Sequence, residues 1–195
     1  EEDLKEPTLV SIKKRLPWLI VLLFLGIAVS SVVGMFESVV AVLPIVICFQ
    51  SLILDMAGNV GTQSLAVTIR VLMDERLSAK DKFMLVVKEM KVGFSNGLLL
   101  GVLAFVCLGI YIGFFKGTTM QSAFLISGCV GISLLVAMVI SSLVGTLVPL
   151  FFPKIKGDPA VASGPLITTV NDLVAVVTYY GLAWIFLIHV LHIAG

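Results

Sequence analysis

Five long apolar runs, separated by short segments that carry nearly all the charge, constrain the fold of this chain more than any other feature. They cover approximately residues 17–36, 39–69, 91–115, 121–152 and 164–189. The hydrocarbon core of a bilayer is about 30 Å thick, and a helix needs about 20 apolar residues to cross it. In lipid only helices and closed barrels satisfy their backbone groups, and continuous apolar runs favour helices over alternating barrel strands. We therefore predict an all-α, multi-pass protein with five transmembrane helices, surrounded by lipid in the cell (inner) membrane.

The overall composition excludes several other classes of protein. Of the 195 residues, 59% are hydrophobic and 13% are charged, whereas about a quarter of an ordinary soluble domain is charged. This excludes a soluble enzyme domain, a disordered tail and a nucleic-acid-binding protein. The three cysteines are scattered within apolar runs, so they form neither a disulfide framework nor a zinc site.

The positive charges predict the orientation of the chain in the membrane. With five spans, twelve of the thirteen Lys and Arg residues fall on one side, and only Lys116 falls on the other. The positive-inside rule then places the N-terminus in the cytoplasm and the C-terminus outside. We expect the first span to begin at Pro17, because proline suits the first turn of a helix.

Asp55 and Asp172 are the two acidic residues that we expect well inside the spans. A charge at mid-membrane costs at least ~2.5 kcal/mol, so each carboxylate needs a physical reason to be there. No Lys or Arg lies deep in any predicted span to pair with them. Either each aspartate is protonated or caps a helix break, or it faces a water-filled path and attracts cations.

The residues around Asp172 favour the second interpretation. Thr168 and Asp172 are four residues apart and share one face of a helix. Thr169 and Asn171 add further polar groups nearby, and we expect both of them, like Asp55, to line a pore. Pro165, together with the glycine before it, is expected to leave carbonyls of the first helical turn free to face water or an ion.

A second polar stretch follows Asp55 inside the second apolar run. Such a stretch is tolerated in a membrane where backbone lines a cavity or where another helix packs closely. Close packing accounts for its glycines but not for so many amides and hydroxyls. We therefore expect this stretch, which interrupts the apolar run, to line a pore. Its residues are Gly58, Asn59, Gly61, Thr62 and Gln63.

Glycine recurs at every fourth position in the third run, at Gly93, Gly97 and Gly101. This pattern is typical of a ridge of small residues against which another helix packs. We assign it a structural role only.

One carboxylate at the Asp172 position is too little to hold a cation within a single chain, which suggests a symmetric dimer. A two-fold axis would bring two Asp172 side chains together, and two carboxylates match one divalent cation. Surroundings made only of oxygen atoms favour a hard ion such as magnesium. Magnesium keeps several of its water molecules, so one or two carboxylates with carbonyls suffice to hold it.

At these residues the chain resembles the membrane domain of the MgtE family of magnesium channels. The resemblance runs in order through nearly the whole chain, and one departure is Ala57, where the family often has a second glycine. The matching segments are Arg15-Leu16-Pro17-Trp18, Gly58-Asn59-Val60-Gly61-Thr62-Gln63-Ser64-Leu65 followed by Arg70, and Gly157-Asp158-Pro159-Ala160-Val161-Ala162-Ser163-Gly164-Pro165 followed by Thr168-Thr169-Val170-Asn171-Asp172.

The resemblance implies a homodimeric channel with a pore lined by the second and fifth helices. It implies that Asp172 recognises a hydrated magnesium ion with help from the backbone carbonyl of Thr168. It also implies that residues 1–16 end a cytosolic connecting (plug) helix and that residues 17–195 form the pore domain. The complete protein would carry a cytosolic N-terminal domain and a pair of CBS modules. In that protein Glu2, Asp3 and Asp158 would contribute to a regulatory magnesium site.

Three kinds of function remain to be compared. The first is passive, potential-driven magnesium influx through a channel. The second is a carrier coupled to protons or sodium, which usually shows paired repeats with broken helices; we see no such repeat. The third is an intramembrane aspartyl enzyme that uses Asp55 and Asp172. We expect the first and do not expect an enzyme.

Overall fold

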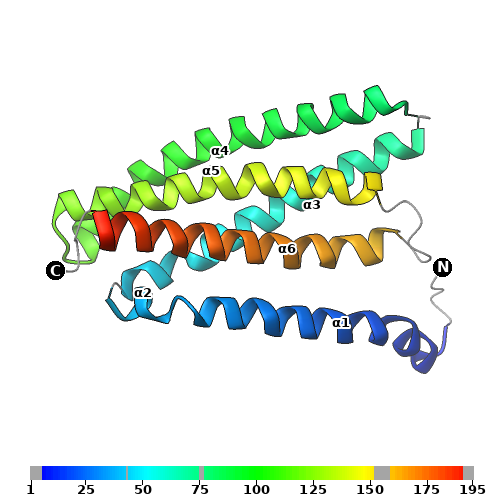
Figure 1. The fold of residues 1–195 in the computed structure, drawn as a ribbon, viewed down its shortest axis with the longest axis horizontal. Helices are drawn as coiled ribbons and strands as arrows, with labels where there is room; N and C mark the ends of the chain where they lie inside the picture. Colours follow the sequence, from blue (N-terminus) through cyan, green and yellow to red (C-terminus); the bar gives the residue numbers. More distant parts are fainter. Residues whose placement is uncertain (1–5, 43, 75–76, 152–158, 191–195) are drawn as a thin grey trace.

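The computed structural model describes residues 6–42, 44–74, 77–151 and 159–190, and the elements in this part of the chain are helical (Figure 1). They are α1 (Thr8–Gly34), α2 (Glu37–Val42), the 3₁₀ helix η1 (Pro44–Phe49), α3 (Gln50–Asp74), α4 (Ala79–Phe115), α5 (Met120–Phe151), α6 (Pro159–Leu182) and the π-helix η2 (Ala183–Val190).

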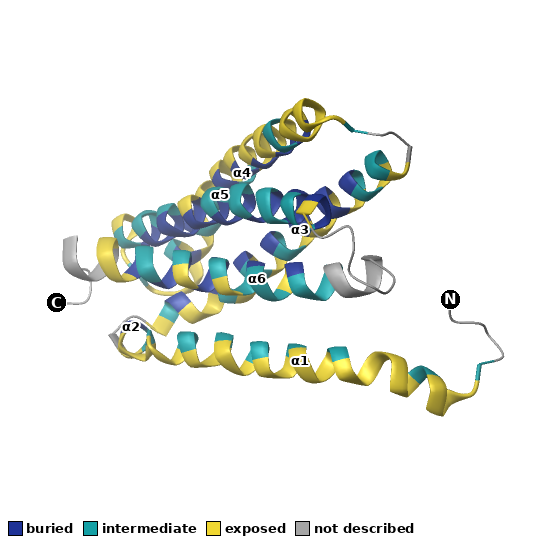
Figure 2. Cartoon of the chain, turned by 45° about the vertical axis from the view of Figure 1, so that its right-hand side comes forward, coloured by how far each residue is buried: buried dark blue, intermediate teal, exposed yellow. Residues whose placement is uncertain are grey.

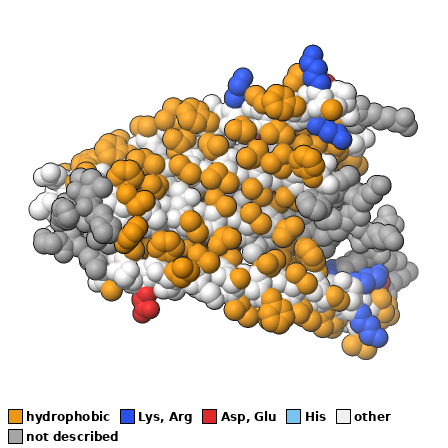
Figure 3. All heavy atoms as spheres, in the orientation of Figure 1, with side chains coloured by type: hydrophobic (Ala, Val, Ile, Leu, Met, Phe, Trp, Pro, Cys, Tyr) orange, Lys and Arg blue, Asp and Glu red, His pale blue; other side chains and the backbone are white. Residues whose placement is uncertain are grey.

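The prediction of five membrane-crossing helices is confirmed for the described residues. Five helical segments are long and apolar enough to cross a bilayer, and they are Thr8–Gly34, Pro44–Met73, Ala79–Phe115, Met120–Phe151 and Gly164–Phe186. On the face shown in Figure 3, hydrophobic side chains cover the middle of the molecule, and Lys and Arg side chains gather toward one end. The start of α1 and the junction between α3 and α4 lie at the same end of the bundle (Figure 1). Which end faces the cytoplasm remains a prediction.

α5 is the central helix, and α4 packs along it through small residues. A methyl group added at Gly101 would lie 2.8 Å from the carbonyl oxygen of Gly131, and one added at Gly131 would lie 2.7 Å from that of Gly101. At Gly93 the added atom would lie 2.7 Å from the Cβ of Ser142. The predicted packing ridge is therefore confirmed, since the two backbones approach too closely for larger side chains.

α1 lies at the edge of the bundle and packs mainly against α6. It has no buried residue, and its exposed surface is visible along its length in Figure 2.

The expectation that α1 begins at Pro17 is wrong, because the helix begins at Thr8 and passes through Pro17 without a break. A proline removes one internal hydrogen bond. The helix stays intact because helix-forming residues lie on both sides of Pro17. The helix thus continues across the boundary between residues 16 and 17, and the division into two domains there remains a prediction.

The second apolar run is irregular near its start and regular through the polar stretch that follows Asp55. Its chain passes from α2 into η1, and α3 then runs unbroken through Gly58 and Gly61. Pro44 explains why a new helical element begins there, because proline lacks an N–H group and its fixed φ angle suits the first position of a helix. A glycine within a helix costs only about 1 kcal/mol, so packing readily keeps α3 intact.

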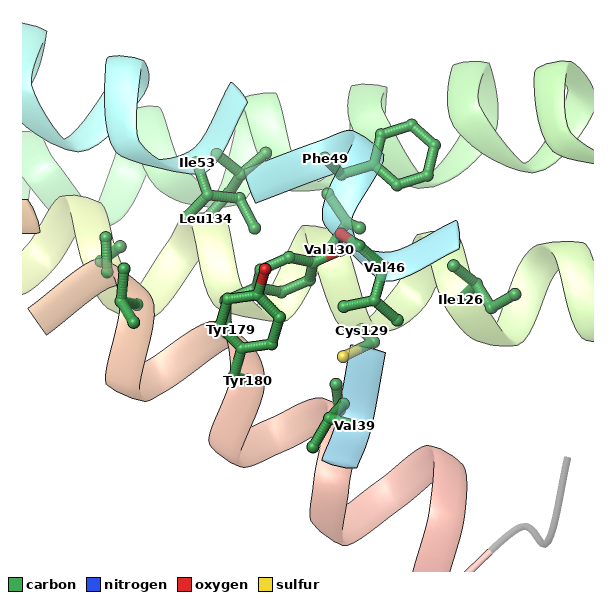
Figure 4. Packing of buried hydrophobic residues seen from close by; sticks show 14 of the residues in the cluster. Val39, Val46, Phe49, Ile53, Ile126, Cys129, Val130, Leu134, Tyr179 and Tyr180 are labelled. Carbon is green, nitrogen blue, oxygen red and sulfur yellow. Dashed lines mark hydrogen bonds between the residues drawn. The ribbon is translucent and has the colours of Figure 1, made fainter. Parts of the chain in front are cut away.

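Two tyrosines of α6 hold η1 and the first residue of α3. The Tyr179 hydroxyl donates to the carbonyl oxygen of Val46 at 2.6 Å, and the Tyr180 hydroxyl donates to Oε1 of Gln50 at 2.5 Å. Figure 4 shows both rings within a buried apolar cluster that also contains Ile53 and Val130. The hydrogen bond to Val46 gives the buried Tyr179 hydroxyl a partner and ties α6 to the backbone of η1.

Two helices begin earlier than the apolar runs indicated. α4 begins at Ala79 rather than near Lys91, and its start is fixed by a capping box between Ser78 and Asp81. α6 begins at Pro159 rather than at Gly164. Pro159 occupies the first helical position, where the missing N–H group costs nothing.

Candidate cation-binding site

The exposed face of α3 carries the polar residues that follow Asp55. Asp55, Asn59, Thr62 and Gln63 are all exposed, and their spacing of four, three and one residues places them on one side of the helix. Asn59 Nδ2 donates to Oδ2 of Asp55 at 3.2 Å, and Thr62 Oγ1 donates to the carbonyl oxygen of Asn59 at 2.9 Å. Because α3 belongs to an apolar segment of spanning length, this polar face is costly in lipid.

A second polar face lies on α6, where Thr168 is exposed and Asp172 is half-buried. Thr168 Oγ1 donates to the carbonyl oxygen of Gly164 at 3.1 Å, and Thr169 Oγ1 donates to that of Pro165 at 3.0 Å. We expected these two carbonyl groups to be free, but each accepts a hydrogen bond from a threonine hydroxyl. Pro165 lies inside α6 and not in its first turn, which corrects the expectation that it opens this helix.

The two polar helices meet at Asn171 and Gly61. Asn171 is fully buried, and its Nδ2 lies 3.4 Å from the carbonyl oxygen of Ala57. A methyl group at Gly61 would lie 2.1 Å from that Nδ2, so a larger residue there would displace the Asn171 amide. Both residues pack between helices in this structure, which does not test the pore-lining role that we expected of them. Gly58 differs, because nothing lies within 4 Å of a methyl group added there.

Neither aspartate has a cationic partner among the described residues. Among the described residues an ion pair joins Glu6, just before α1, to Lys14 within α1. The Lys14 ammonium group lowers the pKa of the Glu6 carboxyl group. The described part of the chain also contains no cluster of three or more His, Cys, Asp or Glu side chains that could hold a metal ion. A cation at Asp172 would need ligands of other kinds, such as carbonyl oxygens, water or a second copy of the chain.

The sequence analysis missed Glu89, a buried acidic residue in α4. Its side chain is 5% exposed, and its Oε2 lies 3.0 Å from the Ser64 hydroxyl of α3. We had expected the third span to begin after it, because Lys88 and Lys91 flank it. Its position four residues before Gly93 places Glu89 on the same packing ridge as the glycines, and this spacing was the signal that could have revealed it.

Comparison with known proteins identifies the family to which these helices belong. The MgtE family, described as a divalent cation transporter, matches residues 50–182. The chain belongs to the MgtE family. The matched segment begins with the first residue of α3 and ends with the last residue of α6, so it contains both polar faces.

Three MgtE relatives named "Magnesium transporter MgtE" show the extent of the similarity. The protein from Enterococcus faecalis is 37% identical over 191 residues, which is 95% of this chain and 39% of that protein. The protein from Bacillus subtilis is 36% identical over 178 residues, 91% of this chain and 38% of that protein. The protein from Thermus thermophilus is 32% identical over 169 residues, 87% of this chain and 35% of that protein. The chain therefore spans about two fifths or less of the MgtE proteins that it matches.

The predicted regulatory residues of this MgtE chain lie outside the described residues. Glu2, Asp3 and Asp158 all fall in segments whose placement is not described. A regulatory magnesium site that contains them remains a prediction from the resemblance.

Proposed function

We propose that this chain forms the pore of a magnesium channel, through which the ion enters passively, driven by the membrane potential. The observation that supports this most strongly is the pair of polar faces on α3 and α6. These two helices touch at Asn171 and Ala57, and both are apolar and long enough to span a membrane. Polar groups at membrane depth are tolerated where they face protein or a water-filled cavity.

A homodimer would give these two faces a common partner. Two-fold symmetry brings the same residues of both copies to one axis, so α3 and α6 of each copy could enclose one path. Each copy would then contribute Asp172 and Thr168 from α6 and Asp55, Asn59, Thr62 and Gln63 from α3. The α4–α5 pair would support this path from outside.

Asp172 is the residue that we propose to attract the ion. Two Asp172 carboxylates from two copies would neutralise one divalent cation. Magnesium gives up its water reluctantly and is usually bound through one or two carboxylates, so carboxylate oxygens would bind the water shell. The Thr168 carbonyl oxygen, one turn away, would accept hydrogen bonds from the same shell.

The membrane potential alone supplies enough driving force for influx. Two charges that cross 100 mV gain about 4.6 kcal/mol, about 2.3 kcal/mol for each charge. With this free energy from the potential, magnesium influx needs no second ion whose gradient drives it.

The first prediction tests Asp172 directly. We expect Asp172→Asn to reduce magnesium flux at least tenfold, because the neutral amide removes the attraction for the ion at a cost of about 1.4 kcal/mol or more. Flux is measured with a magnesium-sensitive dye in liposomes that hold the purified chain under a potassium diffusion potential. Glu37→Gln is the matched control, since Glu37 is an exposed acidic residue at the start of α2. Unchanged flux in Asp172→Asn would remove this residue from the path.

The same liposomes separate a channel from a carrier. A carrier coupled to protons or sodium would lose flux when the gradient of its coupling ion is removed. The channel that we propose keeps its flux as long as the potential is maintained. Flux that followed a proton or sodium gradient at constant potential would favour the carrier.

Regulation would depend on the parts of the relatives that this chain does not match. We propose that acidic residues at the cytosolic end, Glu2, Asp3 and Asp158, would bind magnesium in a closed state together with a cytosolic N-terminal domain and CBS modules. An ion that binds the closed state better stabilises that state.

A further inference from the structure

We propose that Glu89 is a resident proton-binding site. Its carboxyl group is held in the neutral form inside the bundle, and its proton completes a ring of hydrogen bonds that joins α3 and α5 to α4. This proposal goes beyond magnesium transport, and its first test does not depend on flux.

The ring consists of Glu89 and two buried serines. Ser64 of α3 is 3% exposed, and Ser142 of α5 is fully buried. The Ser64 hydroxyl lies 3.0 Å from Oε2 of Glu89 and 3.0 Å from the Ser142 hydroxyl. The Ser142 hydroxyl lies 2.6 Å from the backbone carbonyl oxygen of Glu89. Three oxygen–oxygen contacts thus close a ring that starts and ends on Glu89.

Each of these three contacts needs one proton, and the serines supply only two. A backbone carbonyl only accepts, so Ser142 must donate to it. Ser64 must then donate to Ser142, which leaves no serine proton for the contact between Ser64 and Oε2. If Glu89 is ionised, Ser64 turns to Oε2, and the two serine oxygens face each other without a proton. If Glu89 carries a proton, it donates to Ser64, and every contact in the ring is a hydrogen bond.

The surroundings of Glu89 also disfavour a charge. A buried carboxylate in a membrane helix needs a counter-charge, and no Lys or Arg of the described residues pairs with Glu89. Lys88 and Lys91 of α4 are exposed, as is Arg70 of α3. α5 contains no charged residue between Met120 and Phe151. Protonation removes the charge and uses only a proton from water.

The ring gives Glu89 a positioning role for α3. α4 packs mainly along α5 and only briefly touches α3, so Glu89 is a point at which α4 reaches across to Ser64. Ser64 directly follows Gln63, the last residue of the exposed polar face. The proton on Glu89 therefore helps to hold the helix that presents this face.

Infrared spectroscopy tests the protonation state without reference to transport. We expect the difference spectrum between the parent chain and Glu89→Gln to show the carbonyl stretch of a protonated carboxylic acid, lost in the variant. Glu37→Gln is the control and should remove only carboxylate bands. If Glu89→Gln also removes only carboxylate bands at neutral pH, the proposal is wrong.

A second pair of variants keeps the test decisive if Glu89→Gln does not fold. Ser64→Ala removes the acceptor of the acid proton, so the carboxylic acid band must shift to a different frequency. Thr62→Ala, a change of an exposed hydroxyl on the same helix, should leave the band in place. An unshifted band in Ser64→Ala would exclude the ring.

Stability and flux distinguish a proton from a metal ion at Glu89. Glutamine is neutral and has the same size, so Glu89→Gln should keep the unfolding temperature and the magnesium flux of the parent, whereas Glu89→Ala should lower the unfolding temperature. A loss of flux in Glu89→Gln as large as that in Asp172→Asn, with the unfolding temperature unchanged, would assign a cation to Glu89 and overturn the proposal.

Discussion

At the scale of single residues, Asp55 and Asp172 have different surroundings although both lie in membrane-spanning segments. Asp55 is exposed, and it accepts a hydrogen bond from Asn59 on its own helix. Asp172 is half-buried beside Asn171, where α6 meets α3. A half-buried carboxylate is held more firmly in position than an exposed one, so we expect Asp172 to have the larger role in transport.

This difference predicts an order of effects. We expect Asp55→Asn to reduce magnesium flux less than Asp172→Asn, because an amide at position 55 still hydrogen-bonds to Asn59 and stays on a face that other polar residues share. Flux in liposomes of the same protein content measures both variants. The opposite order would make Asp55 the principal cation site.

Sequence reasoning located the acidic residues on the polar faces, but not the buried one. Unpaired carboxylates within apolar runs are visible in the sequence, and this located Asp55 and Asp172. Glu89 is hidden by the lysines around it, because a charged stretch resembles the end of a span. Nor does residue type separate Asn59, which is exposed, from Asn171, which is buried. That difference depends on which helix packs against each side chain.

At the scale of elements, close approaches between backbones decide which helices are rigidly joined. A methyl group at Gly145 of α5 would lie 2.3 Å from the carbonyl oxygen of Gly61 in α3. The neighbour is backbone, which does not move aside as a flexible side chain does. α3 and α5 must therefore separate to accept any larger residue.

Gly145→Ala tests this contact. We expect it to lower the free energy of unfolding by about 1–3 kcal/mol, the usual cost of overpacking. Thermal unfolding in detergent measures the change. Gly26→Ala is the matched control, since nothing lies within 4 Å of a methyl group at Gly26, and alanine there should not destabilise α1. Equal unfolding temperatures for both variants would contradict the close approach of α3 and α5.

The positions of the helices were predictable, but several of their ends were not. Hydrophobic runs located all five spans, because the length of apolar sequence is a strong signal. Helix starts depend instead on capping groups such as Ser78 with Asp81, and on whether a proline falls at a first turn. Pro159 begins α6, whereas Pro17 and Pro165 lie within helices. A proline alone does not indicate which of these applies.

At the scale of the whole molecule, the proposed dimer predicts which faces meet. In a variant without its native cysteines, we expect Gln63→Cys to cross-link two copies, because the α3 polar faces are proposed to share one path. Leu99→Cys is the control, since Leu99 is 69% exposed on α4 and faces away from α5. Gel mobility after oxidation measures the cross-link. Cross-linking at position 99 in preference to position 63 would mean that the copies meet through α4, and it would contradict a dimer contact at the polar face of α3.

Assembly is the level that the sequence addressed least. Unpaired carboxylates suggested a partner, and a second copy satisfies that need by symmetry. Most of the exposed surface is apolar, which suits lipid and a second copy equally, so the exposed polar face of α3 is the feature that marks a surface for a partner.

The attachment of α1 has a mechanical consequence. This helix runs without a break from Thr8, at the end of the bundle where Lys and Arg side chains gather, and it leans chiefly on α6. A movement of its first turns would be transmitted along the helix to α6, which contains Asp172. The α4–α5 pair packs away from α1 and would be affected less. The orientation of α1 is therefore coupled to that of α6 more directly than to any other helix of the described residues.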